Sequence, residues 1–170
     1  MFRLVVKIIS ALLLLFYQAG VISATEPSKT NIQIANNILL SFSVEDFVKS
    51  GNKMTDCGGG YICLVNDKPF WGSGGGVPTK ILSKLELDLK GKKIHLDTSG
   101  MYNPMVLKND KNRYQVLNHY DDVWKVRGRF SDGEVTYYAE WLVANGHAMR
   151  VVIGGSELLY DAFDHIFKKK

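Results

Sequence analysis

The sequence lacks the patterns by which metal sites, nucleophilic serines and nucleic-acid-binding faces are usually recognised. No pair among its four histidines falls at a His-x-x-x-His or similar ligand spacing: His95, His119, His147 and His165. The Gly-x-Ser-x-Gly spacing of a nucleophile elbow is missing as well. Nothing in the distribution of charge suggests the concentrated basic face that nucleic-acid binding requires. We therefore expect no metal, no cofactor and no nucleic-acid partner, and we assign no catalytic residue.

Cysteine is scarce: the sequence has two, Cys57 and Cys63. An even count in an exported chain favours a disulfide. The bridge would close a short ring that contains three consecutive glycines, which makes so tight a ring sterically easy. The alternative is a catalytic dithiol, but redox motifs place two residues between the cysteines rather than five. We expect a disulfide that shapes a loop.

The apolar run at residues 8–16 is too short to span a bilayer, which takes about 20 apolar residues. The cationic Arg3 and Lys7 come before it, and a small-residue stretch that ends at Ala24 follows it. This order is typical of a secretory signal peptide cleaved after Ala24. The alternative is an uncleaved membrane anchor.

Residues 1–24 are therefore expected to be a signal peptide, and residues 25–170 a single exported globular domain. The size of the second part suits one hydrophobic core. We expect the mature protein to be periplasmic or secreted, without a membrane span once the signal is cleaved.

Two regions show helical spacing. Thr30 and Gln33 resemble a capping box, with apolar residues at helical intervals behind them: Ile32, Ala35, Ile38, Leu39 and Phe42. A second short helix would begin at Ser43 and end at Gly51. At the other end Ser156 is the expected N-cap of an amphipathic helix with one apolar stripe: Leu158, Leu159, Ala162, Phe163, Ile166 and Phe167.

Between these regions, apolar and polar residues alternate with a period of two. The pattern predicts six strands, at about 84–89, 93–98, 113–117, 123–130, 135–144 and 147–153. The first two would form a hairpin, and the last four a meander with turns at residues 131–134 and at Asn145-Gly146. A four-residue turn at 131–134 would pair Phe130 with Val135 and Lys125 with Glu140. The predicted fold class is α+β, mainly antiparallel β, with the helices packed on the sheet.

Residues 57–76, named here the disulfide loop, are the unusual stretch. They hold seven of the sixteen glycines together with Tyr61, Phe70 and Trp71. Aromatic side chains in such a loop either pack into the core or contact a partner, and both interpretations stay open. Tyr102, in a second loop, completes the candidate binding residues.

Three other groups were weighed for chemistry. Ser73 lies in a Gly-Ser stretch, for which a simple loop is the better interpretation. His119 shares the turn at residues 118–122 with two carboxylates, and a solvated turn is favoured over a metal site. Asp122 and Glu140 could flank a cleft as glycosidase carboxylates do, but Glu140 already has a predicted cross-strand partner.

These features favour an exported non-enzymatic binding protein whose partner is another protein. Periplasmic inhibitors and immunity-type proteins belong to this class. The alternatives are a small extracytoplasmic hydrolase and a small-ligand carrier. Converging acids and bases in a cleft would favour the hydrolase, and an apolar cavity of more than about 300 Å³ would favour the carrier. A flat or protruding aromatic patch would favour the binding protein.

Overall fold

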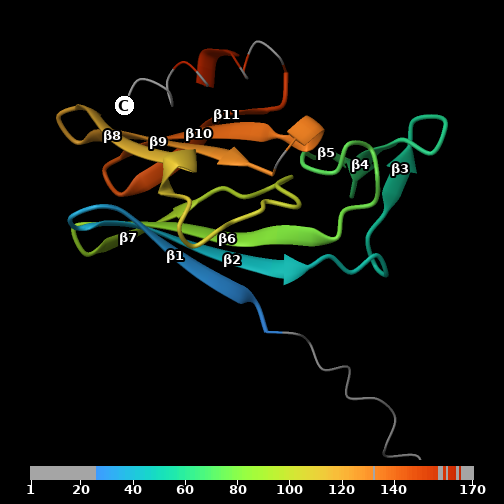
Figure 1. The fold of residues 1–170 in the computed structure, drawn as a ribbon, viewed down its shortest axis with the longest axis horizontal. Coiled ribbons are helices and arrows are strands. Elements are labelled where there is room, and N and C mark those ends of the chain that lie inside the picture. Colours follow the sequence, from blue (N-terminus) through green and yellow to red (C-terminus); the bar gives the residue numbers. More distant parts are fainter. Residues whose placement is uncertain (1–25, 132, 157–158, 160, 164, 166–170) are drawn as a thin grey trace, which may run out of the picture.

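The computed structural model describes residues 26–131, 133–156, 159, 161–163 and 165. Two four-stranded antiparallel sheets pack face to face, and a small three-stranded sheet lies at one end of them (Figure 1). The first sheet has the order β1 (Ser28–Ala35), β2 (Ile38–Asp46), β6 (Lys80–Leu89), β7 (Lys92–Leu96). The second has the order β11 (His147–Gly154), β10 (Tyr137–Ala144), β9 (Val123–Phe130), β8 (Tyr114–Tyr120). The third joins β3 (Met54–Asp56), β4 (Ile62–Val65) and β5 (Lys68–Pro69).

The expected N-terminal helices are wrong, because residues 28–46 form the hairpin of β1 and β2. Two residues, Asn36 and Asn37, connect Ala35 to Ile38, and Asn37 has the positive φ of 62° that such a turn needs. The apolar residues also fit a period of two, since Ile32, Leu40 and Phe42 are all buried on the inner face of the sheet. Pairing of β2 with β6 along nine residue pairs then fixes the strand conformation.

The four-stranded meander is confirmed, but its central register differs by two residues from the prediction. Phe130 pairs with Tyr137 rather than Val135, and Arg127 rather than Lys125 lies opposite Glu140. The connection is longer than expected because a 3-10 turn, Gly133–Val135, follows Ser131. A shift of two residues keeps every side chain on the same face of its strand, so the predicted grouping of side chains by face is unchanged.

The shorter hairpins follow their turn residues. Asn145 and Gly146 connect Ala144 to His147, as predicted. Lys90 and Gly91 connect Leu89 to Lys92 in the hairpin of β6 and β7, which was also predicted.

The expected C-terminal amphipathic helix is not found as a layer on the sheet, and the structure is nearly all β. Among the described residues of this segment, residues 159, 161–163 and 165 are helical. Phe163 packs on Tyr138, with ring centroids 4.8 Å apart, but Ala162 is exposed. The expected stripe residues Leu158, Ile166 and Phe167 lie outside the described residues, as does the expected signal peptide. The predicted α+β class is therefore wrong.

The second sheet supplies the cover that the helices were expected to give. Inner-face side chains of the two sheets form one core: Ile32, Leu40, Phe42, Leu82, Leu85, Leu87, Ile94, Leu96, Tyr114, Val116, Val126, Phe130, Tyr137, Ala139, Trp141 and Val143. Large rings cross the gap between the sheets, as Phe42 does against Tyr114 with centroids 5.0 Å apart. No helix in the described part of the chain is both long and apolar enough to cross a membrane.

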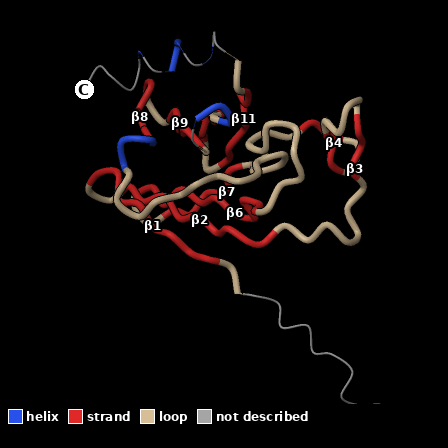
Figure 2. The backbone as a smooth tube through the Cα atoms, turned by 45° about the vertical axis from the view of Figure 1, so that its right-hand side comes forward, coloured by secondary structure: helices blue, strands red, loops and turns tan. Residues whose placement is uncertain are grey.

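The three-stranded sheet stands apart from this core. Figure 2 shows β3 and β4 beyond the end of the two large sheets, joined to them by long connections. Its strands are short, and Val65 alone among their residues is buried. The disulfide loop begins after β3, runs through β4 and β5, and returns along the sandwich toward β6.

Candidate functional site

A surface pocket of about 200 Å³ lies between the disulfide loop and the connection from β9 to β10. Three of the four predicted binding residues line it: Tyr61, Phe70 and Trp71. Ser73 lies beside them, and Glu134 and Thr136 come from the β9–β10 connection. These six residues are called the aromatic pocket below.

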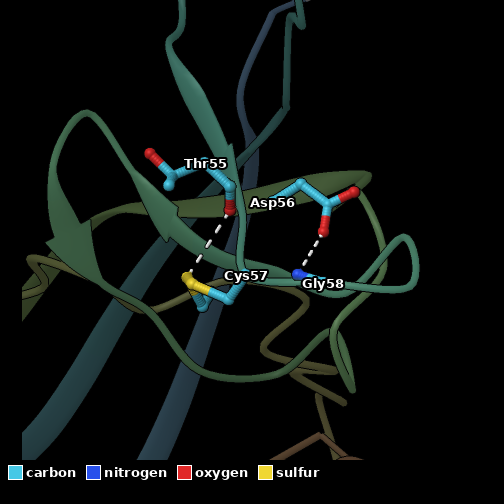
Figure 3. Close-up of a disulfide and its surroundings, with 5 residues drawn as sticks. Thr55, Asp56, Cys57 and Gly58 are labelled. Atoms are coloured by element: carbon cyan, nitrogen blue, oxygen red, sulfur yellow. Dashed lines mark hydrogen bonds between the residues drawn. A yellow bond between two sulfur atoms is a disulfide. The ribbon is translucent and has the colours of Figure 1, made fainter.

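The predicted disulfide between Cys57 and Cys63 is confirmed, with the two Cα atoms 5.9 Å apart (Figure 3). Short backbone hydrogen bonds brace the ring: Cys57 N–H donates to the Tyr61 carbonyl at 2.9 Å, and Tyr61 N–H to the Gly58 carbonyl at 3.1 Å. The carboxylate of Asp56 accepts a further bond from Gly58 N–H at 2.6 Å (Figure 3). The ring thus fixes the backbone on both sides of Tyr61.

The side chain of Tyr61 is 57% exposed although its backbone is fixed. Its ring rests on Gly75, where an added Cβ would lie 2.2 Å from Cδ2 of the ring. The Ile62 N–H donates to the Gly75 carbonyl at 2.7 Å and holds the two segments together. Glycine is required at residue 75 by this close approach, and also by its φ of 84°. Tyr61 is therefore a positioned ring that stays open to solvent.

Trp71 is half-buried, with its backbone built into the sandwich. Its N–H donates to the Gly100 carbonyl at 2.9 Å, and its carbonyl accepts from Tyr102 N–H at 3.1 Å. The ring packs on the core and over Gly100, whose added Cβ would lie 3.0 Å from Cζ3. Both interpretations left open for Trp71 therefore hold together, since one side of the ring packs inward and the residue also lines the pocket.

One side chain, Asn103, ties the disulfide loop to β6. Its Oδ1 accepts from the N–H groups of Thr79 at 3.0 Å and Lys80 at 2.9 Å. Its Nδ2 donates to the Gly72 carbonyl at 2.9 Å. Asn103 itself has a positive φ of 42°, which asparagine tolerates better than most residues. The loop is thus anchored by an amide that sequence reasoning did not single out.

Tyr102 does not join the pocket. It is 7% exposed, and the rings of Phe47 and Phe70 meet it edge-on, each with centroids 5.5 Å away. Burial raises the pKa of its hydroxyl. The Tyr137 hydroxyl donates to the Tyr102 carbonyl at 3.1 Å, which fixes this segment under the pocket. Tyr102 supports the floor on which Phe70 and Trp71 lie.

Glu134 and Thr136 are the lining residues that sequence reasoning missed. The turn at residues 131–134 was recognised, but nothing local indicated that it would face residues 61–75. The signal lies in topology, since both segments are connections at the same end of the sandwich (Figure 1). Gly155, which follows β11, completes this wall of the pocket.

The lining of the pocket offers one carboxylate, Glu134, and no histidine, lysine, arginine or free thiol. Among the lining residues, Glu134 is the one carboxylate that could serve Ser73 as a base, with no histidine, lysine or arginine to act with it. Within the described residues no three His, Cys, Asp or Glu side chains gather at metal-binding range. The arrangement can bind through ring faces, hydroxyls and one negative charge.

The other chemical candidates lie apart from the pocket. His119 lies in the β8–β9 hairpin, where its ring meets that of Tyr120 with centroids 5.0 Å apart. Glu140 is paired with Arg127 on the outer face of the second sheet. Asp122 lines a different cleft, of about 340 Å³, beside Trp124 and Lys92. This cleft opens at the turns of the sandwich and has mixed polar and apolar walls, whereas large side chains fill the space between the sheets.

Comparison with known proteins gives no information on the function of this pocket. No family model, no curated protein and no solved structure matches the chain.

Proposed function

We propose that this chain is an exported, non-enzymatic protein that binds another protein through the surface around the aromatic pocket. Periplasmic inhibitors and immunity-type proteins, which block an attacking enzyme by occupying part of its surface, are the class that fits best. The proposed location is the periplasm or the extracellular medium. The disulfide supports this location, because such bridges persist in oxidising compartments.

The observation that carries the proposal is Tyr61, a large aromatic ring that is 57% exposed on a backbone held by a disulfide and by hydrogen bonds to both sides. Tyrosine is among the residues that are enriched at the anchor positions of protein interfaces. A backbone fixed in advance loses little entropy when a partner docks. Tyr61 and Trp71 therefore form a prepared contact surface.

The chemistry of the pocket supports binding over hydrolysis. A hydrolase needs a nucleophile or water held by a base, with a second group to stabilise charge. The lining of the pocket has a single carboxylate, with no histidine, lysine or arginine to act with it. A carrier would need an enclosed apolar cavity. Large side chains fill the space between the sheets, and the cleft of about 350 Å³ beside Val44 and Val106 is open at the surface and includes Lys80.

The test of binding is affinity capture with residues 25–170 from the native periplasm or medium, followed by titration of the captured protein with two variants. Tyr61→Ala is expected to lower affinity at least tenfold, the effect of losing about 1.4 kcal/mol or more at an interface anchor. Tyr120→Ala is the matched control, because Tyr120 is 61% exposed but lies on the β8–β9 hairpin outside the pocket. Equal affinity of the wild type and Tyr61→Ala for every captured protein would contradict the proposed surface.

The proposed export has its own test. Intact mass of protein recovered outside the cytoplasm is expected to begin at Thr25, within a residue or two. Protein found only in the cytoplasm with Met1 still attached would refute export.

A further inference from the structure

The charge of the aromatic pocket differs from that of three other clefts formed by described residues. Glu134 is the one ionic side chain in its lining. Three other clefts formed by described residues each include at least one lysine: Lys80 in the first, Lys29 and Lys84 in the second, Lys92 in the third. Among these four clefts of the described residues, the aromatic pocket is therefore the one whose lining is negative, in a chain whose net charge is +4.

The Glu134 carboxylate is not used by the fold. It lies exposed in the 3-10 turn Gly133–Val135, and it forms no ion pair or hydrogen bond with another described residue. A carboxylate at the rim of a pocket with no cation in its lining is available to a cation from outside.

The walls of the pocket also suit a cation. Tyr61, Phe70 and Trp71 contribute ring systems, and the faces of such rings attract a cation within about 6 Å of the centroid. The hydroxyls of Ser73 and Thr136 add acceptors for N–H donors. Tyr137, deeper in the lining, stays neutral because burial raises the pKa of its hydroxyl well above its usual value. The pocket thus offers ring faces, acceptors and one negative charge, with no competing cation.

The size of the pocket points to a single side chain. Its volume of about 200 Å³ lies below the ~300–1,000 Å³ typical of pockets for small molecules. Among cationic side chains, the guanidinium of arginine is planar, stacks on aromatic rings and binds a carboxylate through two parallel hydrogen bonds. Lysine offers a compact, strongly hydrated charge that gains less from stacking.

We propose that the aromatic pocket receives an arginine side chain of the protein partner, with the guanidinium between the aromatic rings and the Glu134 carboxylate. The inference rests on the proposed function for the identity of the surface, and it adds the chemistry that the surface recognises.

The direct test needs no partner. Nα-acetyl-arginine methylamide is titrated into 15N-labelled residues 25–170 at millimolar concentration, and the Trp71 indole N–H and the backbone amides of residues 61, 73 and 134 are followed by NMR. Saturable shifts confined to these residues are expected. The matched citrulline compound, which has the same shape without the charge, is expected to give none. Equal shifts with citrulline, stronger shifts with the matched lysine compound, or no shifts at the pocket would overturn the proposal.

Two variants separate the charge from the fold. Glu134→Gln keeps size and exposure but removes the charge, and is expected to weaken arginine binding about tenfold and to lessen its dependence on salt. Glu45→Gln is the control, because Glu45 lines a cleft on the outer face of the first sheet. Arginine binding that survives Glu134→Gln unchanged would contradict the assigned role of the carboxylate.

The captured partner then distinguishes the two proposals. If Tyr61→Ala lowers affinity for the partner while Glu134→Gln does not, the surface is correct and the arginine proposal fails. If neither variant changes affinity for the partner, the proposed function of this surface fails, whatever the arginine compound does.

Discussion

In the sandwich, side chains hold the backbone in place, whereas in the disulfide loop the backbone is held largely by covalent and polar ties. Between the two large sheets, residues such as Trp141, Phe42 and Leu87 are almost fully buried, and the strands follow them. In the loop, Val65 is the one apolar side chain of the three-stranded sheet that is buried. The loop depends instead on a disulfide, on backbone hydrogen bonds and on the amide of Asn103.

This difference matters for function, because a well-packed core leaves no aromatic side chain free for a partner. The loop can present Tyr61 and one side of Trp71 because its fixed shape does not require those rings to be buried. The arrangement also predicts that damage to the core unfolds the molecule, while damage to the ties of the loop changes the pocket first.

The largest effect is expected from Trp141→Ala in the sandwich. Trp141 is fully buried, and its Nε1–H donates to the Asp97 carbonyl at 3.0 Å. Emptying this site is expected to lower the free energy of unfolding by about 3–5 kcal/mol, measured by urea denaturation. Trp71→Ala, at a half-buried ring, is expected to lower it by less, about 1–3 kcal/mol. Equal losses would show that the loop is as much part of the core as β10.

A smaller effect, of about 2–3 kcal/mol, is expected from Gly72→Ala in the loop. Gly72 has a φ of 97°, and an added Cβ would lie 2.1 Å from the Tyr102 carbonyl oxygen and 2.8 Å from the Tyr137 ring. Both the strained φ and the clash oppose the substitution. Gly60→Ala is the matched control, because its φ of 83° is similar and nothing lies within 4 Å of the added Cβ. The same loss in both variants would mean that the close approach at Gly72 contributes nothing.

The sequence was informative where the pattern of the core is local. Alternation along Leu85, Leu87, Ile94 and Leu96 identified the hairpin of β6 and β7, and Asn145-Gly146 fixed the turn between β10 and β11. The division of the meander's side chains between its two faces followed from the same alternation. The register of the meander did not follow from the alternation. It depends on whether the turn after Phe130 has four residues or more, and the contacts of Ser131 decide this, since its N–H donates to the Pro104 carbonyl at 3.0 Å.

The N-terminal hairpin shows why local pattern fails. Residues 32–42 fit a helical period as well as a strand period, so their sequence alone does not decide between them. What decides is the pairing of β2 with β6, about 45 residues away along the chain, which no local window contains. Asn36-Asn37 was the signal that could have been used, since asparagine is common at positive φ in tight turns.

The residues of the candidate site were likewise predictable only in part. Composition identified the disulfide and the aromatic residues of the loop, because glycine, cysteine and tryptophan are conspicuous in a short stretch. It could not identify Glu134 or Asn103, which reach the loop from connections that are distant in sequence. Tyr102 was chosen for its loop position, but the rings of Phe47 and Phe70 bury it.

Removing the disulfide gives a third way to compare the disulfide loop with the sandwich. Replacing both Cys57 and Cys63 by serine is expected to lower the free energy of unfolding by about 2 kcal/mol, the loop-entropy value for so short a ring. Hydrogen exchange is expected to rise at amides 57–63 before it rises in β10, because the sandwich does not depend on the ring. Exchange that rises equally in both regions would show that the disulfide loop and the sandwich unfold as one cooperative unit.

The smallest effect concerns a surface pair on the sandwich. Glu86 on β6 accepts a hydrogen bond from Lys84, with Nζ 2.5 Å from Oε2, and His95 lies 3.9 Å away on β7. The hydrogen bond from Lys84 is the main cause that lowers the pKa of the Glu86 carboxyl below its usual 4.5. A lowered pKa means that the unfolded chain takes up a proton first, so the stabilisation is present above pH 4.5 and is lost as pH falls through the folded value. Since Lys84 is 47% exposed, the effect is expected to stay below about 1 kcal/mol.

Glu86→Gln and Lys84→Met are each expected to flatten the fall in stability on acidification, and the double variant to add little to either. Fully additive effects would mean that the two side chains act independently and that the hydrogen bond does not set the pKa.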